Sequence, residues 1–275
     1  MLSMRASTAT APNGGVVEQR PKRGEANAAW LARAGVDQGV VLLGGATLAD
    51  VRVRFAQSLI RNDLTPSSWS SAALLLGDRL LTVPLDPGED VSSVPAANAI
   101  RALPLDALDD PERYPNVAVI AFAAPGGDAL AAAAADVQRQ RGLIDLPGLL
   151  VAWLGWVWGV DDANPLVTGK GVPSAAFVEA VHAVADIELT PGLASASSCP
   201  EAIWQSARWW GDYYRESARV AATGMTRSAG HAQPQVPAGA YAVRQPAAAV
   251  TVPPTAPTTT GAAAGSGSTT RRTGR

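Results

Sequence analysis

The stretch GVVLLGGATLADVRVRFAQSLIRNDLTPSSWSSAALLLGDRLLTVPL, residues 39–85, decides the fold. It opens on a β-branched apolar run, and apolar side chains then recur at helical spacing behind Thr47 or Asp50 as the helix cap. The runs SSAALLLG and RLLTVPL meet at Gly77 and Asp78, a pair that fits a two-residue hairpin turn. The stretch therefore predicts a strand, a helix and a hairpin in succession.

The rest of the chain adds one strand and then a run of helices. The continuous apolar run NVAVIAFAAP, bounded by Pro115 and Pro125, predicts a buried strand. Four helical segments follow: GDALAAAAADVQRQRG, the largely buried PGLLVAWLGWVWG, PSAAFVEAVHAVADI and a segment that opens at Cys199. Strands that precede a group of helices are typical of an α+β fold.

The two ends of the chain differ in composition from its centre. Residues 1–27 are polar and are predicted to form a disordered arm. Residues 223–275 are rich in Ala, Pro, Thr and Gly, and such a segment cannot bury enough apolar surface to offset its chain entropy. We therefore expect a single folded domain over residues 28–222, followed by a disordered tail.

Charge and cysteine content narrow the class of protein. Hydrophobic residues make up 47% of the chain and charged residues 17%, and no Asp or Glu follows Glu216. The acidic body argues against nucleic-acid binding, which needs clustered Lys and Arg. A single cysteine forms no internal disulfide. The N-terminus has no apolar core of a secretory signal. The apolar stretch at residues 146–160 is shorter than the about 20 apolar residues that a membrane-spanning helix needs. We expect a cytoplasmic protein without an integral membrane segment.

The only cysteine lies in SASSCPEAIWQSARWW, residues 195–210. Ser197 and Ser198 offer capping hydroxyls, and Pro200 suits the first helical position. At a helix N-terminus the backbone N–H groups favour a thiolate, which is what a cysteine hydrolase requires. The alternative is a small buried residue at an ordinary helix start, because free cysteine is among the most buried residue types.

Residues 38–85 and 195–215 together resemble circularly permuted NlpC/P60 domains, a branch of the papain-like cysteine hydrolases. In that family a first strand and a loop or helix lead to an aromatic-Ser-His motif that starts a strand, and the nucleophilic Cys comes late, at the start of an aromatic-rich helix. Trp69-Ser70-Ser71 stands at the motif here, and SSCPEAIWQSARWWGDYY is similar to the closing piece. The resemblance implies a papain-like α+β fold, a small antiparallel sheet packed against several helices, with Cys199 as the catalytic residue.

The chain departs from this family at the catalytic base. Ser71 occupies the His position, and a hydroxyl without a pKa near neutrality cannot act as a general base. His182, on the third predicted helix, is the other candidate base, or else a packing residue. Trp69, Trp204 and Gln57 are candidate binding residues, and Gln57 is either an oxyanion donor or a surface residue. No cluster of His, Cys and carboxylates has metal-ligand spacing, so neither a metal nor a cofactor is predicted.

Two functions follow from this pattern. The first is a thiol hydrolase or acyltransferase that acts on an amide, ester or thioester bond of a peptide or acyl substrate, with a degenerate catalytic base. The second is a non-catalytic binding or assembly module of a multiprotein complex, whose partner is another protein. The sequence leaves the choice between enzyme and binding module open, because fold does not imply function.

Overall fold

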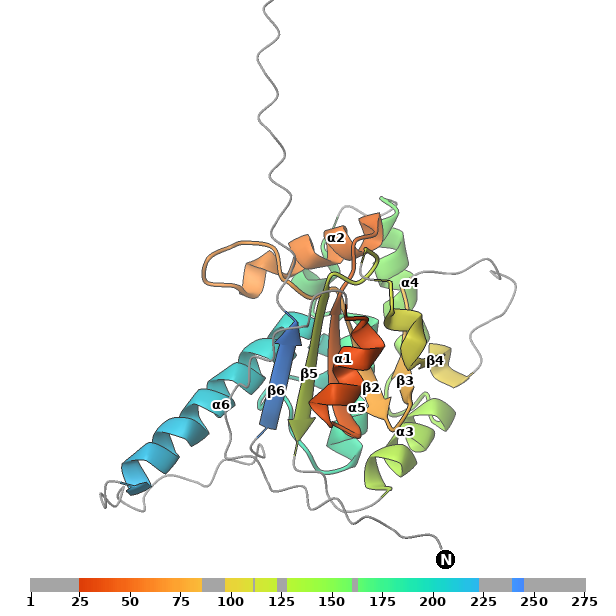
Figure 1. The fold of residues 1–275 in the computed structure, drawn as a ribbon. Helices are drawn as coiled ribbons and strands as arrows, with labels where there is room; N and C mark the ends of the chain where they lie inside the picture. Colours follow the sequence, from red (N-terminus) through yellow and green to blue (C-terminus); the bar gives the residue numbers. More distant parts are fainter. Residues whose placement is uncertain are drawn as a thin grey trace, which may run out of the picture.

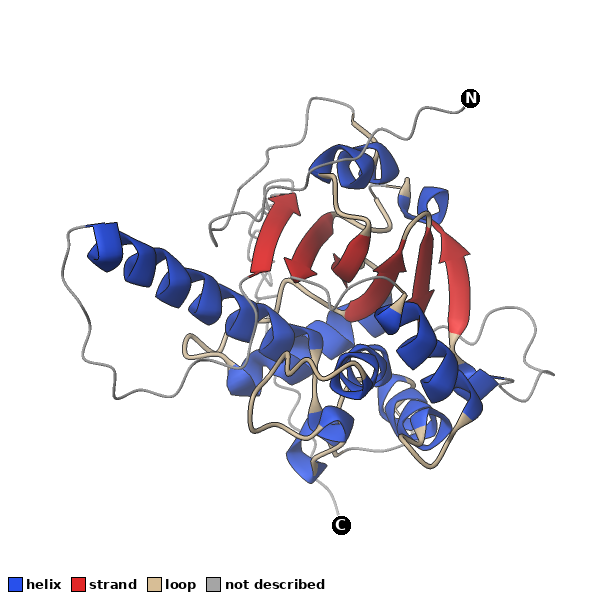
Figure 2. Ribbon diagram, turned by 90° about the horizontal axis from the view of Figure 1, so that it is seen from below, coloured by secondary structure: helices blue, strands red, loops and turns tan. Residues whose placement is uncertain are grey.

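The computed structural model describes residues 25–85, 97–110, 112–122, 128–159, 163–222 and 239–244. A six-stranded antiparallel sheet in the order β4-β3-β2-β1-β5-β6 forms its centre. Helices α3 to α6 cover one face of the sheet, and the short helix α1 covers the other (Figures 1 and 2). The predicted α+β class and antiparallel sheet are confirmed, whereas the papain-like assignment stays a prediction.

The strands pair mostly with their neighbours along the chain. They are β1 Gln38–Gly44, β2 Ser71–Leu76, β3 Arg79–Thr82, β4 Arg101–Pro104, β5 Asn116–Phe122 and β6 Gly239–Arg244. The predicted hairpin is present between β2 and β3, and Gly77 takes the positive φ of 61° that its tight turn requires. β1 lies between β2 and β5, so the strand that opens the decisive stretch is central to the sheet.

Six α-helices and five short 3₁₀ segments are present in the described residues. The α-helices are α1 Asn27–Ala34, α2 Leu48–Ala56, α3 Ala129–Arg139, α4 Leu146–Val157, α5 Pro173–Val184 and α6 Pro200–Ala222. The 3₁₀ segments are η1 Gln57–Ile60, η2 Ala97–Ala99, η3 Leu105–Leu108, η4 Pro165–Thr168 and η5 Ser195–Ser197. Thr47 caps α2 in a full capping box with Asp50, so both predicted cap residues take part.

Side-chain alternation along the strands divides the interior into two cores. Leu42 and Leu74 belong to the core beneath α3 to α6, whereas Leu43 and Leu75 pack against α1 on the opposite face. Because both faces of the sheet are covered, the central strands read as continuous apolar runs instead of alternating ones. Each fully buried Val or Leu side chain contributes about 1.5–3 kcal/mol to folding.

The structure corrects two predictions about particular segments. Residues 239–244 lie inside the predicted disordered tail but form β6 beside β5, so the tail prediction is wrong there. Helix α4 buries Trp153 but leaves Val151 70% exposed, so it is not the largely buried helix that its sequence predicts. The remainder of the tail and residues 1–24 of the predicted N-terminal arm lie outside the described residues.

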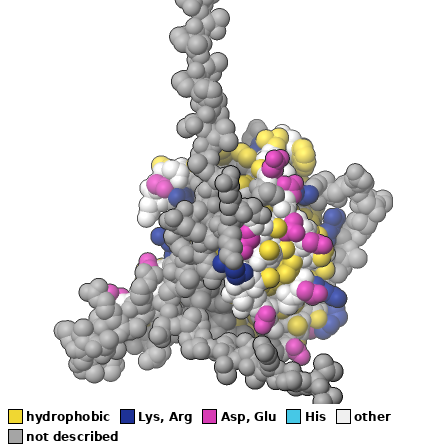
Figure 3. Space-filling model, viewed as in Figure 1, with side chains coloured by type: hydrophobic (Ala, Val, Ile, Leu, Met, Phe, Trp, Pro, Cys, Tyr) yellow, Lys and Arg dark blue, Asp and Glu magenta, His cyan; other side chains and the backbone are white. Residues whose placement is uncertain are grey.

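The outer surface is mixed in character. On the face that carries α1, hydrophobic side chains lie among carboxylates (Figure 3). Within the described part of the chain, no helix combines the length and the apolar composition needed to cross a membrane.

Candidate functional site

The segments that lead into α5 and α6 lie side by side and form the centre of the candidate site. The backbone N–H of Gly171 donates to the carbonyl of Ala196 at 2.7 Å, and that of Val172 donates to the carbonyl of Ser198 at 2.8 Å. The approach is so close that a Cβ on Gly171 would lie 2.3 Å from the Ser198 carbonyl oxygen. These bonds fix the segment that enters α6 against the start of α5.

The start of β2 meets α5. The backbone N–H of Ala72 donates to Ser174 Oγ at 3.1 Å, and Ser174 is buried in the first turn of α5. A Cys–His hydrolase needs its nucleophile within hydrogen-bond reach of its base. Here the helix start that contacts β2, the strand that begins at Ser71, carries Pro173 and Ser174 and not the cysteine.

Ser71 and Cys199 lie on opposite sides of the sheet. Ala72 belongs to the core beneath α3 to α6, and Ala73 belongs to the core against α1. Since side chains alternate along a strand, Ser71 points toward the α1 side, as does its register partner Leu43. Cys199 is part of the other core. The resemblance implied a catalytic pair at these two positions, and the sheet separates them.

Cys199 directly precedes α6, as predicted, but its surroundings do not favour a thiolate. Its side chain is buried, and burial is the main reason that the pKa of the thiol is raised to about 12. The carboxylates of Glu201 and Glu179 raise it further, while the backbone N–H groups of Ala202 and Glu201 oppose them. Desolvation and negative charge outweigh the helix N-terminus here, because both penalise the charged form.

Glu179 is a buried carboxyl that the sequence analysis did not single out. It lies on α5 and accepts hydrogen bonds from Thr190 Oγ1 at 2.5 Å and Ser198 Oγ at 3.2 Å. Burial raises its pKa to about 7, and the nearby Glu188 carboxylate adds to the rise. Glu179 thus ties α5 to both ends of the segment that leads into α6.

His182 is a packing residue on the same helix. It is fully buried, and its Nδ1 lies 2.8 Å from the Val178 carbonyl oxygen. Burial lowers its pKa to about 4. An imidazole with such a low pKa is a poor general base for the proton of a thiol.

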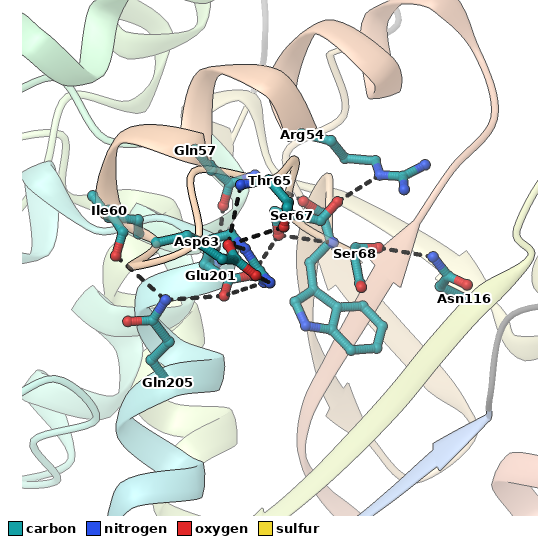
Figure 4. Close-up of polar contacts among 12 residues, drawn as sticks. Arg54, Gln57, Ile60, Asp63, Thr65, Ser67, Ser68, Asn116, Glu201 and Gln205 are labelled. Atoms are coloured by element: carbon teal, nitrogen blue, oxygen red, sulfur yellow. Dashed lines mark hydrogen bonds and ion pairs between the residues drawn. The ribbon is translucent and has the colours of Figure 1, made fainter. Parts of the chain in front are cut away.

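A buried polar network joins η1 and the loop before β2 to the first turn of α6 (Figure 4). Gln57 accepts from the backbone N–H of Glu201 at 2.8 Å and donates to the carbonyls of Trp69 at 2.7 Å and Val53 at 3.1 Å. Gln57 is therefore fully buried instead of exposed, and its amide is used within the protein. It caps α6, whereas the predicted caps Ser197 and Ser198 donate to other groups.

The Glu201 carboxylate is the charged centre of this network. It accepts from Ser67 Oγ at 2.6 Å, from Arg61 at 2.9 Å and from the amide of Gln205 at 3.0 Å. Arg61 also pairs with Asp63 on the exposed side of the loop. Because these donors surround the buried charge, the network can hold the loop before β2 against α6.

The two candidate aromatic residues pack against each other. The rings of Trp69 and Trp204 meet edge to face with centroids 5.2 Å apart. Trp69 is only 2% exposed, so it is a core residue and its ring is not available to a ligand. Trp204 is partly exposed, and the guanidinium of Arg208 lies over its ring.

The sequence signals for this site were uneven. Cys199 could be found because it stands beside a helix boundary, and Gln57 because it precedes the Trp69 motif. Glu179 and Ser67 carry no local signal of burial. In the described ranges, no group of three or more His, Cys, Asp and Glu side chains could hold a metal ion.

Comparison of the chain with protein families, with curated proteins and with solved structures found no match.

Proposed function

We propose that this chain is a non-catalytic binding module with an α+β fold. The environment of Cys199 is the observation that supports this most. Burial raises the pKa of this thiol to about 12, so the thiol is neutral at pH 7, whereas the thiolate is the form that acts as a nucleophile. The site is therefore built to keep its sulfur neutral.

The neighbouring groups favour the same conclusion. Ser71 lies across the sheet from Cys199, and the α5 start that meets β2 carries Ser174 in place of a thiol. Gln57, a candidate oxyanion donor, has its amide bonded to two backbone carbonyls. Groups that a hydrolase would aim at a substrate are here used to join elements of the fold.

Thiol labelling tests this proposal. We expect iodoacetamide to leave Cys199 unmodified in the folded full-length chain from pH 6 to pH 9, and to modify it at the rate of a free thiol in guanidinium chloride. The Cys199→Ala variant controls for modification at other residues. Labelling of the folded chain with an inflection well below about 8.5, together with a covalent adduct from a thioester or acyl probe, would instead establish the hydrolase or acyltransferase.

A further inference from the structure

Helix α2 has an apolar side that faces away from the core. Val53 and Ala56 on its inner side are buried, whereas Leu48 and Phe55 are 65% and 60% exposed. The two exposed residues are seven positions apart, which is about two helical turns, so they lie on the same outer face. Leu59, on the η1 turn that continues α2, is 58% exposed. Large apolar side chains are therefore exposed along the outside of α2 and η1.

Helix α4 shows the same feature. Its sequence LPGLLVAWLGWV holds no charged residue, and a helix that is apolar on every side is normally buried. Trp153 and Val157 are buried, but Val151 and Trp158, also seven positions apart, are 70% and 60% exposed. The outer side of α4 thus offers apolar surface that the described part of the chain leaves open to solvent.

Several contacts place these side chains on one surface. Helices α2 and α4 pack against each other at the same end of the molecule, where hydrophobic side chains gather (Figures 1 and 3). The guanidinium of Arg52 on α2 lies 5.0 Å from the ring centroid of Trp156 on α4. The amide of Asn164 donates to the Ala56 carbonyl at 3.0 Å and so holds η4, with its 71% exposed Val167, against the end of α2. The exposed apolar residues that form this α2–α4 surface are Leu48, Phe55, Leu59, Val151, Trp158 and Val167.

We propose that the α2–α4 surface binds the same surface of a second copy of this chain. A fully exposed aromatic side chain offers about 150–250 Å² and an aliphatic one less, so the six exposed side chains leave on the order of 600 Å² in water. This reaches the top of the range of about 300–600 Å² for the largest apolar patch on a monomer. With a polar rim it matches the about 800 Å² that each partner contributes to a standard stable interface.

The composition of the α2–α4 surface favours a second copy over a different protein. Homodimer interfaces are more apolar than transient ones, and charged residues are depleted at their centre. In a two-fold dimer each patch meets itself, so an uncharged apolar patch is complementary to its own copy. Two helices from each copy then form a four-helix layer in which the exposed apolar sides are buried.

The arginines around this surface argue against a membrane. Protein segments that bind anionic lipid present Lys and Arg to the headgroups beside their apolar side chains. Arg54 instead donates to the Ser67 carbonyl, and Arg61 pairs with two carboxylates of the chain. Arg52 lies over the Trp156 ring. Because these cations serve contacts within the chain, a protein partner is favoured over lipid.

Sedimentation velocity of the full-length chain tests the proposal. We expect a species of twice the mass of one chain, with a dissociation constant on the order of micromolar or tighter. The double variant Phe55→Glu/Val151→Glu places carboxylates of both copies in the interface and should weaken dimerisation at least about 100-fold. The matched control Val184→Glu/Leu193→Glu changes two exposed apolar residues elsewhere and should dimerise like the wild type.

Trp fluorescence gives a second readout in a variant that keeps the surface apolar. Dilution of the wild type should shift its emission to the red, because Trp158 meets water when the copies separate. Trp158→Phe should still dimerise but lose most of this shift, which decides the question if the glutamate variant does not fold. A wild type that stays monomeric up to about 100 μM would overturn the proposal. So would an unchanged dissociation constant in the glutamate variant, or a dilution shift that survives in Trp158→Phe.

Vesicles of phosphatidylcholine and phosphatidylserine distinguish a membrane from a second copy. We expect no co-sedimentation of the wild type with them. Binding of a monomeric wild type to the vesicles that is lost in Phe55→Glu/Val151→Glu would assign the surface to lipid and refute the dimer. The proposal goes beyond the proposed function and does not involve Cys199, so sedimentation and thiol labelling can fail independently.

Discussion

Replacing Glu179 by Gln should change how the stability of the protein depends on pH. The Glu179 carboxyl is 4% exposed, and its pKa rises from an ordinary 4.5 to about 7 in the folded protein. Between these values the folded state keeps a proton that the unfolded state releases. Stability from this group is therefore fully present below about pH 4.5 and is lost as the pH rises through about 7. Gln cannot ionise, so the variant loses this dependence.

The size of the effect follows from the shift in pKa. A rise from 4.5 to about 7 corresponds to about 3 kcal/mol of unfolding free energy between pH 4.5 and pH 8. His182 acts in the opposite direction, because its pKa falls from 6.5 to about 4 and its contribution is lost as the pH falls. The two contributions nearly cancel in the wild-type profile. The difference between wild type and Glu179→Gln isolates the carboxyl.

The assay is urea unfolding followed by Trp fluorescence at half-unit steps from pH 4.5 to pH 8. We expect the unfolding free energy of Glu179→Gln to gain on the wild type by about 3 kcal/mol across this range. Glu112→Gln, at an exposed position, should run parallel to the wild type. Parallel curves for wild type and Glu179→Gln would refute the reasoning, because they would mean that Glu179 titrates alike in the folded and unfolded chains.

Two further substitutions test the contacts between the α5 and α6 starts and their surroundings. Gln57→Ala removes the α6 cap and two other buried hydrogen bonds, so we expect a loss of about 3 kcal/mol or more in urea unfolding. The exposed Gln140→Ala, outside this network, should change stability by less than about 0.5 kcal/mol, and an equal effect of the two would contradict the capping role. Gly171→Ala forces a Cβ toward the Ser198 carbonyl and should lower the free energy of unfolding by about 1–3 kcal/mol. Gly142→Ala has open space around its new Cβ and should be nearly neutral. Similar melting temperatures for the two glycine variants would argue against the close contact.

Local sequence patterns were sufficient for most of the secondary structure. The apolar run at β1, the Thr47 cap of α2 and the turn at Gly77 each act over a few residues, so the residues themselves determine them. For residues 239–244, local sequence patterns are not sufficient to predict the secondary structure. Their composition is that of a disordered segment, and only pairing with β5 makes them a strand.

The geometry of the candidate site depends on contacts between residues that lie far apart in the sequence. The sequence alone determined that Cys199 precedes a helix, that no motif histidine is present and that the fold is α+β. Only the tertiary structure placed Ser71 on the opposite face of the sheet, buried Glu179 beside the cysteine and brought Gln57 to cap α6 across 144 residues. The physical reason is that a pKa depends on burial and on charges brought close by folding, and these distances are not encoded in the spacing of residues along the chain.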